Sequence, residues 1–302
     1  MAAIGGHFLI IIAGVFYGTI PVFATLLSRY EVSTTEQVFV RLALSVSIFL
    51  AYVLLKGRHS LRLNPRDYFH FFIFGLAGIA LFFTLYMTAA VMASVTVAVL
   101  LLYTQPIFTL ILSRILYRRQ IMLSGYLAIL LALIGVAAIF RVWDISWADF
   151  GLGHIFALMT GFLYSVYIIF MSRKTPKYDT LTVTFWAFLF GLVWMLPLWF
   201  LTHLVFKNPV MTGLDFSLPV NTWLLLIAFT LCTNIIAYLA FNHGIRTVEP
   251  HRAGVLVLAE PLVAIILGAA LLGQTLYLTD LIGGILILVS FLIVKRRRKS
   301  KP

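Results

Sequence analysis

Charged residues and cysteine are scarce in this 302-residue chain. Charged residues make up 11% of it, whereas hydrophobic residues make up 62%. About a quarter of the residues in a soluble domain are charged, so the composition excludes an ordinary soluble protein and indicates a membrane protein. The single cysteine, Cys232, excludes an internal disulfide and a multi-cysteine metal site.

Several catalytic signatures are also missing. The chain has no H-E-x-x-H, no G-x-S-x-G, no Walker A sequence and no pair of acids within an apolar stretch. An intramembrane enzyme and direct coupling to ATP are therefore disfavoured. No histidine has a partner at metal-ligand spacing, so we expect neither a metal nor a cofactor.

Long apolar runs are what the chain does contain. A membrane-spanning helix needs about 20 mostly apolar residues, and ten such runs occur, with only short connections between them. The first run lacks a basic leader, so we expect a helix there and not a cleaved signal peptide. The fold class predicted is an all-α membrane protein with ten transmembrane helices. The runs are 7–28, 36–55, 68–89, 94–116, 121–140, 152–171, 181–202, 223–242, 253–272 and 280–294.

The basic residues are distributed unevenly between the two sides of these runs. If the N-terminus is cytoplasmic, seventeen of the 22 lysines and arginines are cytoplasmic, and only Arg29, Arg141 and Lys207 lie in loops on the other side. This positive-inside pattern predicts a multi-pass protein of the plasma (inner) membrane with both termini in the cytoplasm. The net charge of +12 is then explained by contact with membrane lipid, above all at the tail "KRRRKSKP", and not by nucleic acid.

The two halves of the chain resemble each other. "GHFLIIIAGVFYG" from Gly6 aligns with "GHIFALMTGFLYS" from Gly153, and "YTQPIFTLIL" from Tyr103 aligns with "LAEPLVAIIL" from Leu258. We expect a five-helix repeat over 1–145 and a second one over 146–302, the latter with the basic tail. Because five is odd, the second unit enters the bilayer from the other side, an inverted arrangement typical of alternating-access transporters.

Together these features resemble a known family. The ten helices, Arg41 in "VFVRLAL", Trp186 in "TFWAFLFG" and Glu260-Pro261 before "LVAIILGAALLGQTL" are similar to the EamA-type permeases of the drug/metabolite transporter superfamily. The resemblance covers the whole chain and implies transport, with export as the expected direction, but no particular substrate. The chain departs from many relatives at Arg119 and Gln274, which lie at helix ends.

Two prolines interrupt matching helices of the repeats. Pro106 leaves the carbonyl of Leu102 without its helical donor, and Pro261 does the same to Val257. Such carbonyls are tolerated in a membrane only when buried in protein or facing a water-filled cavity. Both helices are therefore expected to bend toward the protein interior, either as packing kinks or as moving hinges.

Glu260 is the only acid well inside an apolar run. An ionisable group in the membrane indicates a functional site by default. It could bind a substrate ammonium group or a coupling proton, or it could tie its helix to a neighbour. An ion pair with Arg41 is disfavoured, since about 12 Å of depth separates them at ~1.5 Å per residue. Arg41 and Arg114 are expected to have a structural role, either extending toward the membrane interface or bonding to carbonyls at helix ends.

Polar and aromatic side chains complete the predicted substrate cavity. Asn234, Tyr238 and Asn242 recur at helical spacing and form one stripe, which should face the interior. The full set predicted to line the cavity is Tyr17, Tyr86, Tyr103, Gln105, Tyr164, Tyr167, Trp186, Asn234, Tyr238, Asn242 and Glu260.

We predict a secondary transporter of a small amphipathic metabolite, such as an amino acid or amine, that works by alternating access. Phosphorylated cargo is disfavoured because the apolar runs hold only two arginines, both near helix ends. A multidrug or organic-cation exporter of the same fold and a non-transporting scaffold or receptor are the alternatives. The sequence is compatible with a monomer and gives no firm indication of oligomeric state.

Overall fold

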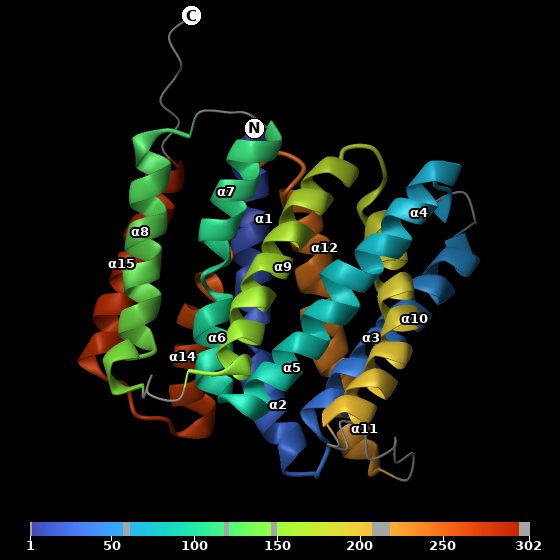
Figure 1. The fold of residues 1–302 in the computed structure, drawn as a ribbon, viewed down its shortest axis with the longest axis horizontal. Helices are drawn as coiled ribbons and strands as arrows, with labels where there is room; N and C mark the ends of the chain where they lie inside the picture. The colour runs from blue at the N-terminus through green and yellow to red at the C-terminus, as the bar shows by residue number, and fades with distance from the viewer. Residues whose placement is uncertain (1, 57–60, 118–120, 146–149, 207–217, 296–302) are drawn as a thin grey trace, which may run out of the picture.

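The computed structural model describes residues 2–56, 61–117, 121–145, 150–206 and 218–295, and these form a bundle of helices (Figure 1). In this part of the chain, eight helical stretches are long and apolar enough to cross a membrane, and two shorter apolar helices bring the number to ten. Each of the ten predicted runs lies on one of these helices, shifted at its ends by a few residues. The predicted fold class is confirmed.

Five spans come from each half of the chain. The first five are α1 (Ala2–Tyr17) with α2 (Ile20–Ser28), α3 (Thr34–Lys56), α4 (Pro65–Phe74) with η2 (Gly75–Leu81) and α5 (Phe82–Met92), α6 (Val95–Leu102) with α7 (Gln105–Tyr117), and α8 (Leu123–Ile139). The second five are α9 (Leu152–Lys174), α10 (Thr180–Phe206), α11 (Val220–Phe229) with η4 (Thr230–Ile236) and α12 (Ala237–Gly244), α13 (Pro250–Leu256) with α14 (Ala259–Leu272), and α15 (Leu278–Lys295). A short 3-10 helix, η3 (Val142–Asp144), follows α8.

The packing of these helices follows the internal repeat. The first span packs against α12 and α14 of the other half, and its counterpart α9 packs against α5, α6 and α7. Equivalent spans also meet in pairs: α3 contacts α10, α8 contacts α15, and the fourth and ninth spans meet through α7 and α13. The pair α8 and α15 forms one flank of the bundle in Figure 1. An inverted five-helix duplication accounts for these exchanged partners, because each unit contributes the same contacts from the opposite end.

Two π-helical stretches, η2 and η4, widen the third and eighth spans. The number of residues between the start of η2 and the start of η4 equals the number between Pro106 and Pro261. The two stretches therefore occupy equivalent positions in the two repeats. A π-helical turn rotates the residues that follow it and is common at functional sites. The sequence analysis did not predict these stretches, since hydrophobic periodicity does not reveal them.

Helix breaks occur where the two prolines predicted them. The helix stops at Leu102 and resumes at Gln105, and its counterpart stops at Leu256 and resumes at Ala259. A methyl group added at Gly14 would lie 2.8 Å from the oxygen of Val257, and one added at Gly161 would lie 3.2 Å from that of Leu102. Each carbonyl that proline deprives of its donor is thus buried against a glycine of the other half. The close approach needs glycine because any side chain would collide with the exposed backbone.

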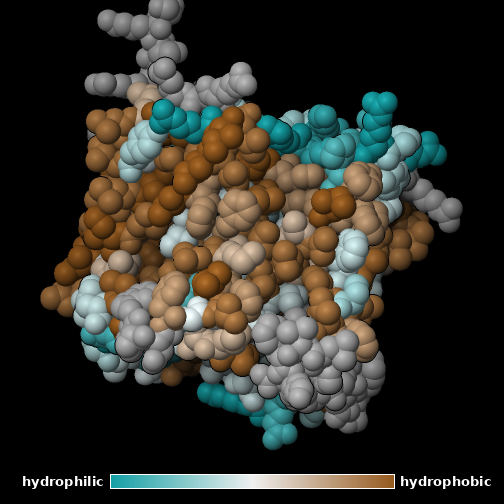
Figure 2. Space-filling view, viewed as in Figure 1, coloured by the Kyte–Doolittle hydropathy of each residue, from teal (hydrophilic) through white to brown (hydrophobic). Residues whose placement is uncertain are grey.

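The surface shows how the bundle would sit in a bilayer. On the face that Figure 2 shows, apolar residues cover the middle of the bundle and hydrophilic residues gather toward its two ends. Large apolar side chains on α8 and α15 face outward, such as Leu123 (74% exposed) and Leu292 (65% exposed). Apolar residues exposed on this scale would aggregate in water and indicate contact with lipid. The start of α1 lies at the same end as the start of α8 (Figure 1).

Candidate functional site

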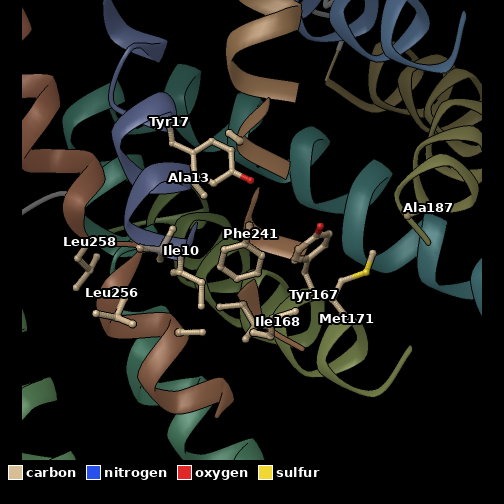
Figure 3. Packing of buried hydrophobic residues seen from close by; sticks show 14 of the residues in the cluster. Ile10, Ala13, Tyr17, Tyr167, Ile168, Met171, Ala187, Phe241, Leu256 and Leu258 are labelled. Carbon is tan, nitrogen blue, oxygen red and sulfur yellow. The ribbon is translucent and has the colours of Figure 1, made fainter. Parts of the chain in front are cut away.

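A cluster of tyrosines lies where the two halves meet. The ring of Tyr238 on α12 is 5.5 Å from that of Tyr17 on α1 and 5.7 Å from that of Tyr167 on α9, both edge to face. Tyr164 adds a further ring 6.2 Å from Tyr167. Figure 3 shows Tyr17 and Tyr167 on either side of Phe241 within the buried core. Edge-to-face pairs of this kind hold the rings in place.

Glu260 belongs to this cluster. It lies in the first turn of α14, directly after the break, and accepts a hydrogen bond from the Tyr103 hydroxyl at the matching break. Tyr17, Tyr86 and Tyr164 lie close enough to Glu260 for their hydroxyl groups to interact electrostatically with its carboxyl group. Glu260 is half-buried, so part of the residue is accessible and not enclosed by protein.

The charge of Glu260 is not neutralised by a neighbouring base. No lysine, arginine or histidine of the described residues forms an ion pair with it. Its position at the start of α14 supplies partial compensation, because the free N–H groups of a helix N-terminus favour an anion. A buried carboxylate held only by a tyrosine and a helix end is suited to a cation brought by a ligand.

Arg41 differs from its prediction. It does not extend toward the membrane interface: it is 6% exposed, and its Nε and Nη2 donate to Oδ1 of Asn234 at 3.1 and 2.7 Å. Its guanidinium also lies 3.9 Å from the ring centre of Phe229. The π-helical turn η4 brings Asn234 within reach, which the sequence pattern could not show. The argument against an ion pair with Glu260 agrees with the contacts observed. Arg114 is exposed and donates to the Tyr126 hydroxyl of α8.

The polar stripe on the eighth span faces the bundle interior, as predicted. Asn234 is 2% exposed and Asn242 is fully buried. Asn242 accepts a bond from the Tyr167 hydroxyl at 2.8 Å and donates to Thr184 at 2.9 Å. Both asparagines therefore join helices, and only Tyr238 of the stripe lies in the tyrosine cluster.

Two residues predicted to line the cavity lie elsewhere. Gln105 is fully buried, donates to the carbonyl of Gly254 at 2.7 Å and accepts from Thr109 at 3.0 Å. Its amide thus binds the two halves together, in a position closed to solvent. Trp186 donates to the carbonyl of Leu61 at 2.8 Å, in the connection between α3 and α4 near one end of the bundle. The remaining aromatic residues of the predicted set, with Glu260, do come together.

The sequence analysis missed a buried ion pair. Lys174 at the end of α9 contacts Asp67 in the first turn of α4, and each side chain is 11% exposed. The hydroxyl of Tyr178 also donates to Asp67, and together with burial this bond raises the pKa of Tyr178. Lys174 counted only as a positive-inside charge in the sequence. This ion pair joins the two halves of the protein at one end of the bundle, where α4 begins and α9 ends.

Histidine, cysteine and acidic side chains do not gather into a metal site. No group of three or more of them is placed to hold an ion in the described ranges. The groups that the tyrosine cluster offers to a ligand are one carboxylate, several phenolic hydroxyls and aromatic rings. Aromatic rings and a carboxylate together recognise ammonium groups.

Comparison with known proteins points to transport. The sequence profile of the EamA-like transporter family matches residues 4–141 and 151–296. An uncharacterized transporter of Archaeoglobus fulgidus is 28% identical over 292 residues, which cover 96% of each protein. One of Clostridium kluyveri is 21% identical over 294 residues, covering 95% of this chain and 92% of the relative. A solved crystal structure with 18% identity has a TM-score of 0.72 and covers 96% of both chains, a likeness of fold alone.

Proposed function

The chain belongs to the EamA-like transporter family, and on that premise we propose that it exports a small amphipathic metabolite such as an amino acid or amine. As a member of a family of multi-pass membrane transporters it is not an enzyme. The proposed cargo binds between the halves and reaches either side of the membrane in turn. The half-buried carboxylate of Glu260 within the tyrosine cluster is the observation that supports this most.

The chemistry of the site favours a substrate with an ammonium group. The group would pair with the Glu260 carboxylate and lie against the faces of Tyr17, Tyr86 or Tyr238. A desolvated cation over an aromatic ring gains about 2 kcal/mol, and the carboxylate adds the larger share. Apolar neighbours such as Phe241 and Phe188 accommodate the rest of an amphipathic molecule.

The two helix breaks are proposed as the moving parts. The breaks before Pro106 and Pro261 place Tyr103 and Glu260 at facing positions, one from each half. A bend at either break would change the distance between these groups and so couple binding to the opening of one side. In this scheme the units are 1–145 and 146–302, and a single chain contains the complete site and works as a monomer.

We propose an orientation in the plasma (inner) membrane with both termini in the cytoplasm. Arg62, Lys177 and Arg246 lie in connections between helices, Arg66 lies in the first turn of α4, and Arg173 lies in the last turn of α9. The start of α4 and the end of α9 lie at the end of the bundle where the chain begins (Figure 1). Basic residues on one side support a cytoplasmic location for that side. Most of the basic tail predicted to meet lipid, 296–302, lies outside the described residues.

Export of organic cations is a second candidate function. An amino acid also carries a carboxylate, which needs a partner of its own, and the guanidinium of Arg41 is already bound to Asn234. A purely cationic amine or drug avoids this requirement. A non-transporting scaffold would need neither a half-buried carboxylate nor an aromatic cluster around it.

Ligand-dependent thermal stability and transport test the proposal. Purified wild type is screened against amines, amino acids and organic cations, and each ligand that raises its apparent melting temperature is then assayed for uptake into everted membrane vesicles. We expect a cationic ligand whose stabilisation is lost in Glu260→Gln and retained in Glu31→Gln, an exposed acid outside the cluster. Stabilisation and transport that persist in Glu260→Gln would contradict the assigned site.

A further inference from the structure

A cavity lies away from the tyrosine cluster, at the end of the bundle where α8 begins. Its volume is about 420 Å³, and its walls come from the end of α7, the start of α8, the connection between α12 and α13, and the end of α15. It shares no lining residue with the tyrosine cluster. The bond from Gln105 to Gly254 joins α7 to α13 about two helical turns before the cavity wall at Ser113.

The wall contains a buried hydroxyl without a partner. Ser113 is 5% exposed, and its Oγ has no hydrogen-bond partner among the residues that the structure describes. A buried polar group left unpaired costs about 1 to 3 kcal/mol. Ser113 also lines the cavity, and rotation of its side chain to another rotamer would turn the buried hydroxyl toward a ligand acceptor there and remove this cost.

Positive charge and free N–H groups surround the same space. Arg246 lines the cavity, and its guanidinium forms no ion pair with the described residues. The first turn of α8 contributes Ser124 and Gly125, and the His251 ring lies 3.7 Å from where a methyl group on Gly125 would be. A helix N-terminus beside a cationic side chain is a favourable place for an anion.

Glu249 also lines the cavity, and its negative charge opposes the positive charge of the arginines there. Glu249 pairs with Arg252 at 2.9 Å, and Arg252 also donates to the carbonyl of Val294 at 3.3 Å. The charges of Glu249 and Arg252 therefore compensate each other. Among the described lining residues, the positive charge of Arg246 and the partial positive charge at the start of α8 remain for an anion. The carboxylate of Glu249 also lies 3.8 Å from Nε2 of His251.

The remaining walls are apolar and lead to the lipid-facing surface. Ile121, Met122 and Ile293 line the cavity, and Leu123 and Leu292 beside them are exposed on the outer surface of α8 and α15. A ligand that fits has an anionic head for the polar wall and a hydrocarbon part for this surface. Phospholipids have this form and meet the protein at this depth.

We propose that this cavity binds a phosphate group, that of an anionic phospholipid in the adjacent leaflet. Basic pockets between transmembrane helices on the cytoplasmic side are known to suit such head groups. The phosphate would accept from Ser113, from Arg246 and from the first N–H groups of α8. Occupancy would hold α8 and α15 to α7 and α13, because residues of all four helices form the walls.

Lipid-dependent thermal stability tests this inference without any knowledge of the transported substrate. The purified full chain in detergent is titrated with phosphatidylglycerol, with phosphatidylcholine, and with sodium phosphate against sodium chloride at equal ionic strength. Four proteins are compared: wild type, Ser113→Ala, Arg246→Ala and the control Arg62→Ala, which removes an exposed basic residue at the same end but outside the cavity.

We expect phosphatidylglycerol to raise the apparent melting temperature of wild type and Arg62→Ala more than phosphatidylcholine does. Arg246→Ala should need roughly tenfold more phosphatidylglycerol for the same shift, as expected for a lost charged hydrogen bond, and Ser113→Ala should show a smaller loss. Stabilisation by sodium phosphate alone, sensitive to Arg246→Ala, would support the phosphate site but assign it to a soluble ligand. Equal responses to both lipids with none to phosphate, or equal losses in Arg246→Ala and Arg62→Ala, would overturn the proposal.

Discussion

Substitution of Asp67 by asparagine should destabilise the protein strongly, because it removes one partner of a buried ion pair. The side chains of Asp67 and Lys174 are each 11% exposed. Loss of one partner leaves the other charge buried, at a cost of about 3 to 5 kcal/mol. Since asparagine can still accept from Lys174 and Tyr178, we take the lower end, about 3 kcal/mol. For a protein of this size that corresponds to a fall in melting temperature of roughly 6 to 12 °C.

The assay is the apparent melting temperature of the detergent-solubilised protein, followed by size-exclusion chromatography after heating. Lys174→Met and the double variant Asp67→Asn/Lys174→Met complete a double-mutant cycle. We expect the double variant to lose about 2 kcal/mol less unfolding free energy than the sum of the losses in the two single variants. Arg66→Gln, which changes an exposed charge on the same turn, should have almost no effect. Losses of less than a degree in both single variants, or strict additivity, would refute the reasoning.

Three other substitutions test the packing and the polar contacts. Gly14→Ala places a methyl group 2.8 Å from the oxygen of Val257 and should cost about 1 to 3 kcal/mol, whereas Gly5→Ala, with nothing within 4 Å, should not lower the melting temperature. Asn234→Leu leaves the Arg41 guanidinium without its acceptor, so the yield of folded protein should fall sharply. The double variant Arg41→Leu/Asn234→Leu should recover part of that yield. An unchanged yield in Asn234→Leu would show that the bond is dispensable. Tyr167→Phe removes the donor to Asn242 and should cost about 1 to 2 kcal/mol in thermal stability, and a variant as stable as wild type would argue against that bond.

Apolar length and local chemistry made the fold predictable from the sequence. The ten spans followed from runs of about 20 apolar residues, and the two breaks followed from Pro106 and Pro261, because proline removes a donor wherever it lies in a helix. The contact of the freed carbonyls with Gly14 and Gly161 was not predicted, although both glycines belong to the segments that align between the two halves. Small residues indicate close approach, but not which backbone atom is approached.

Side-chain partners across the bundle were harder to predict. The tyrosines and Glu260 come together because all belong to helices that meet at the interface between the halves. Gln105, Trp186 and Arg41 have partners that the sequence did not indicate, since the sequence gives the depth of a side chain but neither the rotation of its helix nor the π-helical turn that contains Asn234, the partner of Arg41. Asp67 and Lys174 lie at helix ends, where sequence patterns do not distinguish a buried charge from a solvated one.

Direct titration of the purified transporter with its stabilising amine tests the central claim, that Glu260 and the tyrosines around it form the substrate site. Calorimetry on wild type, Glu260→Gln and Tyr238→Phe gives the dissociation constant of each, and the melting temperature in the absence of ligand reports whether each variant is folded. We expect folded Glu260→Gln to bind about a hundredfold more weakly and Tyr238→Phe to bind nearly as well as wild type, because phenylalanine keeps the aromatic face. Binding by Glu260→Gln as tight as that of wild type would contradict the claim and place the substrate elsewhere.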